Sequence, residues 1–106
     1  MNQDNFKITK EKNPNNVKLT IRGRLDIVNA DLLQIELNEL MKEKPDCILL
    51  NMSHVIYLSS AGLKVVLKTY KDAKNAGSIL GIEMPSEKVL GILEMTALER
   101  LLISNN

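Results

Sequence analysis

Hydrophobic and polar residues alternate in two short segments near the amino terminus. Phe6 and Ile8 lie between polar neighbours in residues 6–10, and apolar residues again take every second position over 17–21. A turn-rich segment, 11–16, separates the two. This pattern is typical of a hairpin-like pair of strands, each with one buried and one exposed face.

Helical spacing replaces the alternation further along the chain. We expect a helix over about residues 30–43, with Asn29 as its amino-terminal cap and Pro45 after its end. Leu32 widens its apolar stripe. The stripe itself consists of Leu33, Leu37, Leu40 and Met41.

Residues 46–52 then form an apolar run without alternation, which predicts a strand buried on both faces at the centre of a sheet. Cys47 is expected to pack there as a small hydrophobic side chain. A second helix is predicted from near Ser60 to the stop at Gly77, with apolar residues on one face and lysines on the other.

The carboxyl-terminal third repeats the strand–helix order. Residues 78–84 predict a strand, and Pro85-Ser86-Glu87 opens a further helix whose inward residues are Val89, Leu90, Leu93 and Met95. Residues 96–100 predict a turn or short helix, and 101–103 a last short strand. The alternation of strands and helices indicates an α/β fold with a mixed, mainly parallel sheet of about four to five strands and helices packed against it.

Length, charge and cysteine content limit the number of domains, the kinds of partner and the compartment that the chain is expected to have. A chain of 106 residues with 44% hydrophobic and 25% charged residues predicts a single domain, 1–106. A net charge of +1 disfavours nucleic acid as a partner. The single cysteine cannot form an internal disulfide and fits a reducing compartment. The sequence also has no signal-like segment and no apolar run long enough to cross a bilayer, so we expect a cytoplasmic protein without a membrane partner.

Two adjacent serines are the main candidates for a functional site. Ser59 and Ser60 fall where the central strand gives way to the second helix. Unpaired amides at a helix start favour an anion. The residues alone leave two readings open, because a serine there either caps the helix or accepts and loses a phosphate.

Other chemistry has little support. His54 and Cys47 are the only histidine and cysteine, so no zinc-ligand spacing exists, and we expect neither metal nor cofactor. No phosphate-binding glycine loop is present. A small hydrolase using Ser60 or His54 stays a minor alternative, because no nucleophile-elbow motif accompanies them. The lysine face of the second helix either steers an acidic partner or is simply solvated.

Taken together, the chain resembles the STAS domain family, and within it the stand-alone bacterial anti-sigma factor antagonists. Three stretches carry the resemblance, in the family's order and spacing. They are Gly23-Arg24-Leu25-Asp26, then Ile48–Val55 followed by Leu58-Ser59-Ser60-Ala61-Gly62-Leu63, and Glu87–Thr96.

The resemblance implies a protein switch. It places the phosphorylated residue at Ser60 and partner contacts at Asp26, Ser59, Ser60, Ala61, Gly62 and Lys64. The implied partners are an anti-sigma factor that is also a serine protein kinase, bound by the unphosphorylated chain so that the sigma factor is released, and a phosphatase of the PP2C type. The domain would be a monomer and a substrate, not an enzyme. The alternatives within the family are a STAS subunit of a transporter complex and a scaffold in a stress-signalling particle.

Overall fold

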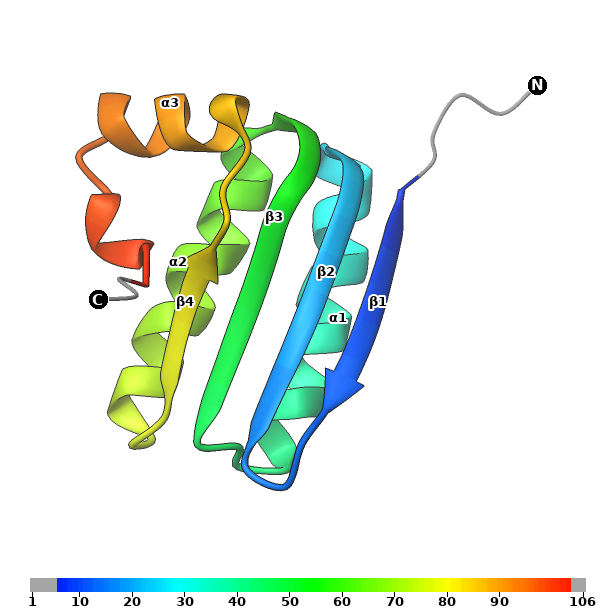
Figure 1. Ribbon diagram of the computed structural model, residues 1–106, viewed down its shortest axis with the longest axis vertical. Helices are drawn as coiled ribbons and strands as arrows, with labels where there is room; N and C mark the ends of the chain where they lie inside the picture. Colours follow the sequence, from blue (N-terminus) through cyan, green and yellow to red (C-terminus); the bar gives the residue numbers. More distant parts are fainter. Residues whose placement is uncertain (1–5, 104–106) are drawn as a thin grey trace.

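A computed structural model describes residues 6–103 as a sheet with two long helices on one side and a shorter helix at its upper end (Figure 1). Its strands are β1 (Lys7–Lys12), β2 (Asn16–Leu25), β3 (Cys47–Leu58) and β4 (Ile79–Glu83). They lie in the order β1-β2-β3-β4. β1 is antiparallel to β2, whereas β2, β3 and β4 are parallel. The predicted mixed, mainly parallel sheet is confirmed.

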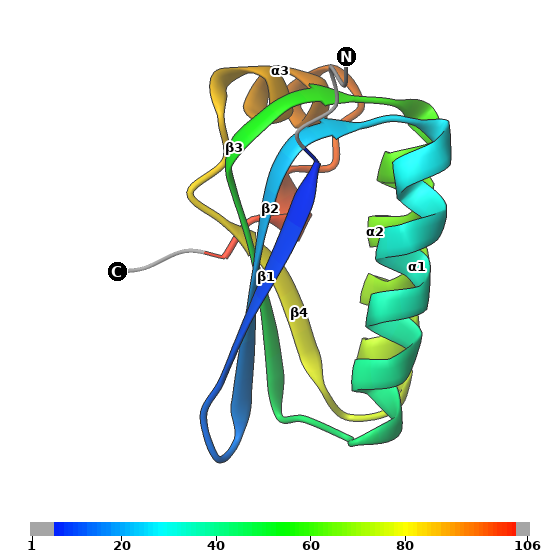
Figure 2. The same cartoon turned by 90° about the vertical axis from the view of Figure 1, so that its right-hand side faces the viewer.

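Two long helices cover one face of this sheet, as Figure 2 shows. They are α1 (Ile27–Lys42) and α2 (Ser60–Asn75), and they pack side by side. The shorter α3 (Glu87–Met95) packs beside the upper part of β3, and the short 3₁₀ helix η1 (Glu99–Leu101) follows it. Leu102 makes a single parallel bridge to β4 at Ile82, so the predicted last strand is reduced to one pair.

The core lies between the sheet and the two long helices. Its fully buried side chains include Leu19, Ile21, Leu33, Leu37, Ile48 and Leu50. The expectation that residues 46–52 are buried on both faces is wrong. Ile48, Leu50 and Met52 are buried, but the alternate residues of β3 are only half-buried. The reason is that α1 and α2 lie on the same side, so the outer face of β3 stays partly open to solvent.

Several predicted boundaries and orientations also need correction. β3 continues to Leu58 instead of ending at residue 52, and α1 begins at Ile27, capped by Asp26 and not by Asn29. Leu32 is 50% exposed and Met95 84% exposed, so neither faces the core. Both lie on helices whose opposite faces already fill the space against the sheet.

Gly91 gives a first test of the helix assignments. A Cβ built on this residue of α3 meets no atom within 4 Å. Gly91→Ala should therefore raise the free energy of unfolding by about 1 kcal/mol, the propensity difference between alanine and glycine within a helix. Urea denaturation followed by circular dichroism measures this. A loss of stability would show that α3 is packed more tightly here than described.

Candidate partner-binding site

Ser59 and Ser60 divide the two roles that the sequence left open. Ser59 is the amino-terminal cap of α2, and its Oγ accepts a hydrogen bond from the backbone N–H of Gly62 at 3.1 Å. The same hydroxyl donates to the carbonyl oxygen of Leu25 at 2.8 Å. Ser60 is the first residue of the helix and is exposed. The hydroxyl of Ser59 is thus engaged in the fold, while Ser60 faces solvent.

The end of β2 fixes the start of α1 beside this serine pair. Gly23 has a φ of 102°, a conformation that favours glycine, at an irregularity in the β2–β3 pairing. Two residues on, the carbonyl of Leu25 accepts from both the N–H of Ser59, at 3.0 Å, and its hydroxyl. One carbonyl therefore ties the start of α2 to the segment that leads into α1.

Asp26 then caps α1, since its Oδ1 accepts from the N–H of Asn29 at 2.9 Å. Asn29 is buried, and its side-chain amide donates to the carbonyl of Arg24 at 2.9 Å. Asn29 is thus a support for the loop instead of the cap. Two helix amino termini, each with a partial positive charge, begin from this shared anchor.

Gly62 is the point of closest approach between the two segments. A Cβ on this residue would lie 2.7 Å from Cγ of Leu25 and 3.0 Å from its carbonyl oxygen. Ala61 is half-buried, Gly62 is buried, and Lys64 is exposed one helical turn after Ser60. Of the predicted contact residues, Ser60 and Lys64 offer exposed side chains, while Ser59 and Gly62 chiefly hold the surface in shape.

Exposed apolar residues on the same two segments were missed in the sequence. Ile27 is 71% exposed and Val28 68% exposed, both in the first turn of α1, and Ile56 is 61% exposed near the end of β3. Leu32 and Ile35 continue the apolar surface along α1. We call Ile27, Val28, Ile56 and Ser60 the docking surface. All four lie at the same end of the sheet, because Leu25 at the end of β2 pairs with Leu58 at the end of β3. Large exposed apolar groups at one end of a domain are typical of a protein-binding site.

Comparison with known proteins identifies the family of the chain. The STAS domain family matches residues 7–106. The chain belongs to the STAS domain family. A curated relative, the anti-sigma-B factor antagonist of Bacillus subtilis, is 28% identical over 98 residues, which cover 92% of this chain and 89% of the relative.

Solved structures share the STAS fold at lower identity. An anti-sigma factor antagonist from Mycobacterium paratuberculosis superposes with a TM-score of 0.83 at 20% identity, covering 95% of this chain and 86% of its own. The Bacillus cell fate determinant SpoIIAA in its phosphorylated form gives a TM-score of 0.74 at 14% identity, covering 95% and 91%. These two likenesses establish the fold.

The two residues considered for other chemistry lie elsewhere in this STAS domain. His54 pairs with Arg22 in the sheet and is exposed on the outer face, so the structure does not assemble it with Ser60. Cys47 is half-buried on that face, and the expectation of a core position is wrong. Burial raises the pKa of the Cys47 thiol, and Glu83 and Asp46 act in the same direction.

No group of three or more His, Cys, Asp or Glu side chains in residues 6–103 is placed to hold a metal ion. Within the same range, no helix has the length and apolar character needed to cross a bilayer.

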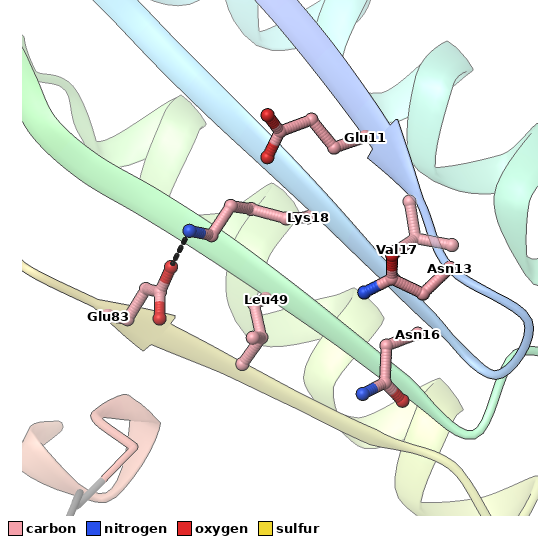
Figure 3. Close-up of a pocket in the computed structure, with 7 residues that line it drawn as sticks. All are labelled: Glu11, Asn13, Asn16, Val17, Lys18, Leu49 and Glu83. Carbon is pink, nitrogen blue, oxygen red and sulfur yellow. Dashed lines mark ion pairs between the residues drawn. The ribbon is translucent and has the colours of Figure 1, made fainter.

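A separate hollow lies at the other end of the sheet, on its outer face (Figure 3). Its volume is about 470 Å³, and the residues around it are Glu11, Asn13, Asn16, Val17, Lys18, Leu49 and Glu83. Lys18 and Glu83 form an ion pair of 3.1 Å across it, which links β2 to β4 over β3. Because the Lys18–Glu83 ion pair spans the hollow and braces three strands, we assign this hollow a structural role.

The cap at Ser59 can be tested against a second cap of the same form. Ser59→Ala should lower the free energy of unfolding by about 1 kcal/mol, because the N–H of Gly62 loses its acceptor. Ser86 caps α3 in the same way, since it accepts from the N–H of Val89 and donates to the carbonyl of Val55. Ser86→Ala is the matched control, with a similar loss of stability by urea denaturation. An unchanged stability of both variants would show that neither hydroxyl acts as a cap.

Proposed function

We propose that this STAS domain is an anti-sigma factor antagonist. In its unphosphorylated form it binds an anti-sigma factor that is also a serine kinase, and the sigma factor is released. Phosphorylation of Ser60 ends the binding. The observation that carries the proposal is the exposed hydroxyl of Ser60 at the first position of α2, beside apolar residues that have no cover among residues 6–103. The relative that is 28% identical over most of the chain is itself an antagonist.

The physical basis of the switch is the desolvation of charge. A neutral hydroxyl costs little to cover with a partner, and burial of Ile27, Val28 and Ile56 favours the complex. A phosphate adds roughly −1.5 to −2 charges at neutral pH. The amides at the start of α2 stabilise that charge in the free protein. In the complex the same charge would be stripped of water among apolar groups, which opposes binding.

The fold need not change for this switch to work. Among the side-chain hydrogen bonds of residues 6–103, none involves the hydroxyl of Ser60, whereas the hydroxyl of Ser59 joins the start of α2 to Leu25. A phosphatase of the PP2C type then restores the binding form. In this proposal the chain is one domain, acts as a monomer in the cytoplasm, and is a substrate without chemistry of its own.

Capture from a lysate of the source organism tests the proposal. The purified unphosphorylated chain and a Ser60→Asp variant serve as baits, and captured proteins are identified by mass spectrometry. The expected result is a soluble ATPase of the serine-kinase type on the first bait only, which transfers phosphate from ATP to Ser60 when purified. Capture of a membrane permease in place of such an ATPase would contradict the proposal and favour a role as a transporter subunit.

A further inference from the structure

Basic side chains form a row across three strands on the outer face of the sheet. The pairing places Lys7 of β1 opposite Arg22 of β2, and Arg22 opposite His54 of β3. Residues directly opposite on neighbouring strands share a face, and in the antiparallel pair of Lys7 and Arg22 the Cβ atoms are about 4.5–5.5 Å apart. All three side chains are exposed. Ile8 and Ile21, the strand neighbours of Lys7 and Arg22, pack on the core side of the sheet. Because side chains alternate along a strand, the basic row lies on the face opposite α1 and α2.

Irregular pairing in β3 aligns this row. Register shifts occur between Thr20 and Arg22 and between Gly23 and Arg24 of β2. They bring His54 opposite Arg22 and Tyr57 opposite Arg24. The guanidinium carbon of Arg24 lies 4.4 Å from the centre of the Tyr57 ring. Stacking of this kind holds an arginine in place while its N–H groups remain available as donors. We call Lys7, Arg22, Arg24 and His54 the basic patch.

The charges of the basic patch are not balanced within the described structure. None of the ion pairs formed among residues 6–103 includes Lys7, Arg22 or Arg24. Lower on the same face, by contrast, Lys18 pairs with Glu83 and lies opposite Glu11. Like charges directly opposite in a sheet repel one another. An anion laid along the row would relieve that repulsion.

We propose that the basic patch binds an acidic segment of a protein partner, on the opposite side of the sheet from α1 and α2. Guanidinium groups match carboxylates in bidentate geometry, and the patch holds two arginines. Polybasic membrane sites use about 4–8 lysines and arginines together. The patch has three, and the exposed lysines of α2 lie across the sheet from it. With a net charge of only +1, the chain also lacks the broad field that nucleic acid binding requires. This inference extends beyond the docking surface and does not depend on Ser60.

Fluorescence anisotropy with a fluorescein-labelled octaglutamate peptide tests the proposal at low ionic strength. Arg22→Glu should weaken binding about tenfold, because one charge reversal removes an attraction and adds a repulsion. Lys71→Glu, on the exposed face of α2, changes the net charge equally and should alter the affinity by about twofold or less. Amide shifts on titration should fall at Lys7, Arg22 and His54. The thermal midpoint of Arg22→Glu should not fall, since the new carboxylate faces Lys7.

Two results would overturn the proposal. The first is an equal loss of affinity in Arg22→Glu and Lys71→Glu, which would mean that the peptide responds only to net charge. The second is failure of octaglutamate to bind while phosphatidylserine-containing vesicles or a single-stranded oligonucleotide bind in an Arg22-dependent way. That result would assign the patch to a membrane or to nucleic acid. The docking surface around Ser60 would be unaffected by either result.

Discussion

Ser60→Asp is expected to weaken binding of the anti-sigma partner about ten- to hundredfold, which corresponds to about 1.4–2.7 kcal/mol. The new carboxylate would lose its water beside the apolar side chains of the docking surface, and the exposed Lys64 one helical turn away would offset only part of that cost. Ser60→Ala should retain full affinity, because a methyl group costs nothing to desolvate, and it should accept no phosphate. Isothermal titration calorimetry measures the affinities, and mass spectrometry after incubation with the kinase and ATP measures the modification.

Asn13→Asp is the matched control for added negative charge. Asn13 is exposed in the turn between β1 and β2, at the opposite end of the sheet. Its variant should bind the partner as tightly as the unchanged chain. If phosphate appears on Ser59 in the unchanged protein, or if Ser60→Asp binds normally, the assignment of the switch to Ser60 is wrong.

Gly62→Val should cost about 1–3 kcal/mol of stability, the usual range for overpacking of a close-packed site. A side chain here would collide with Leu25 and with the carbonyl oxygen that anchors Ser59. The start of α2 must therefore move away from the start of α1, and partner affinity should fall as well. Thermal unfolding and titration calorimetry on the same samples measure the two effects.

Gly91→Val separates this effect from the general cost of valine within a helix, because a Cβ at Gly91 meets nothing within 4 Å. If Gly62→Val does not fold, Gly62→Ala introduces only the colliding Cβ and keeps the test available. Full partner affinity in a folded Gly62→Ala variant, despite lowered stability, would show that the partner does not contact the region where the starts of α1 and α2 meet.

The alternation and helical spacing of the sequence were enough to predict the order of strands and helices. What they missed depends on contacts between distant segments. The end of β3 was missed because irregular pairing breaks the alternation after Asn51, so Val55 and Leu58 are inward without the regular spacing of a strand. Asp26 and Asn29 are both good capping residues, and the structure shows Asp26 as the cap while the side chain of Asn29 bonds to the carbonyl of Arg24.

In the candidate site, too, the features that depend on contacts between distant segments could not be predicted from the sequence. The sequence located the serine pair and, through the resemblance, the loop that contains Asp26. It did not reveal the exposure of Ile27 and Val28, because a short apolar pair next to a helix start is equally compatible with a core position. Nor did it show the basic patch, whose members lie on three strands and meet only through the pairing register.

The hydrogen bonds of Ser59 also bear on how a kinase distinguishes two neighbouring identical side chains. Its hydroxyl hydrogen is donated to Leu25, and its oxygen accepts from Gly62. To serve as a nucleophile it would first have to leave both partners and unravel the beginning of a helix. In the proposed switch, discrimination between the two serines would thus come from the substrate itself, and a kinase with little preference for flanking sequence should still modify Ser60, whose hydroxyl makes no such hydrogen bonds among residues 6–103.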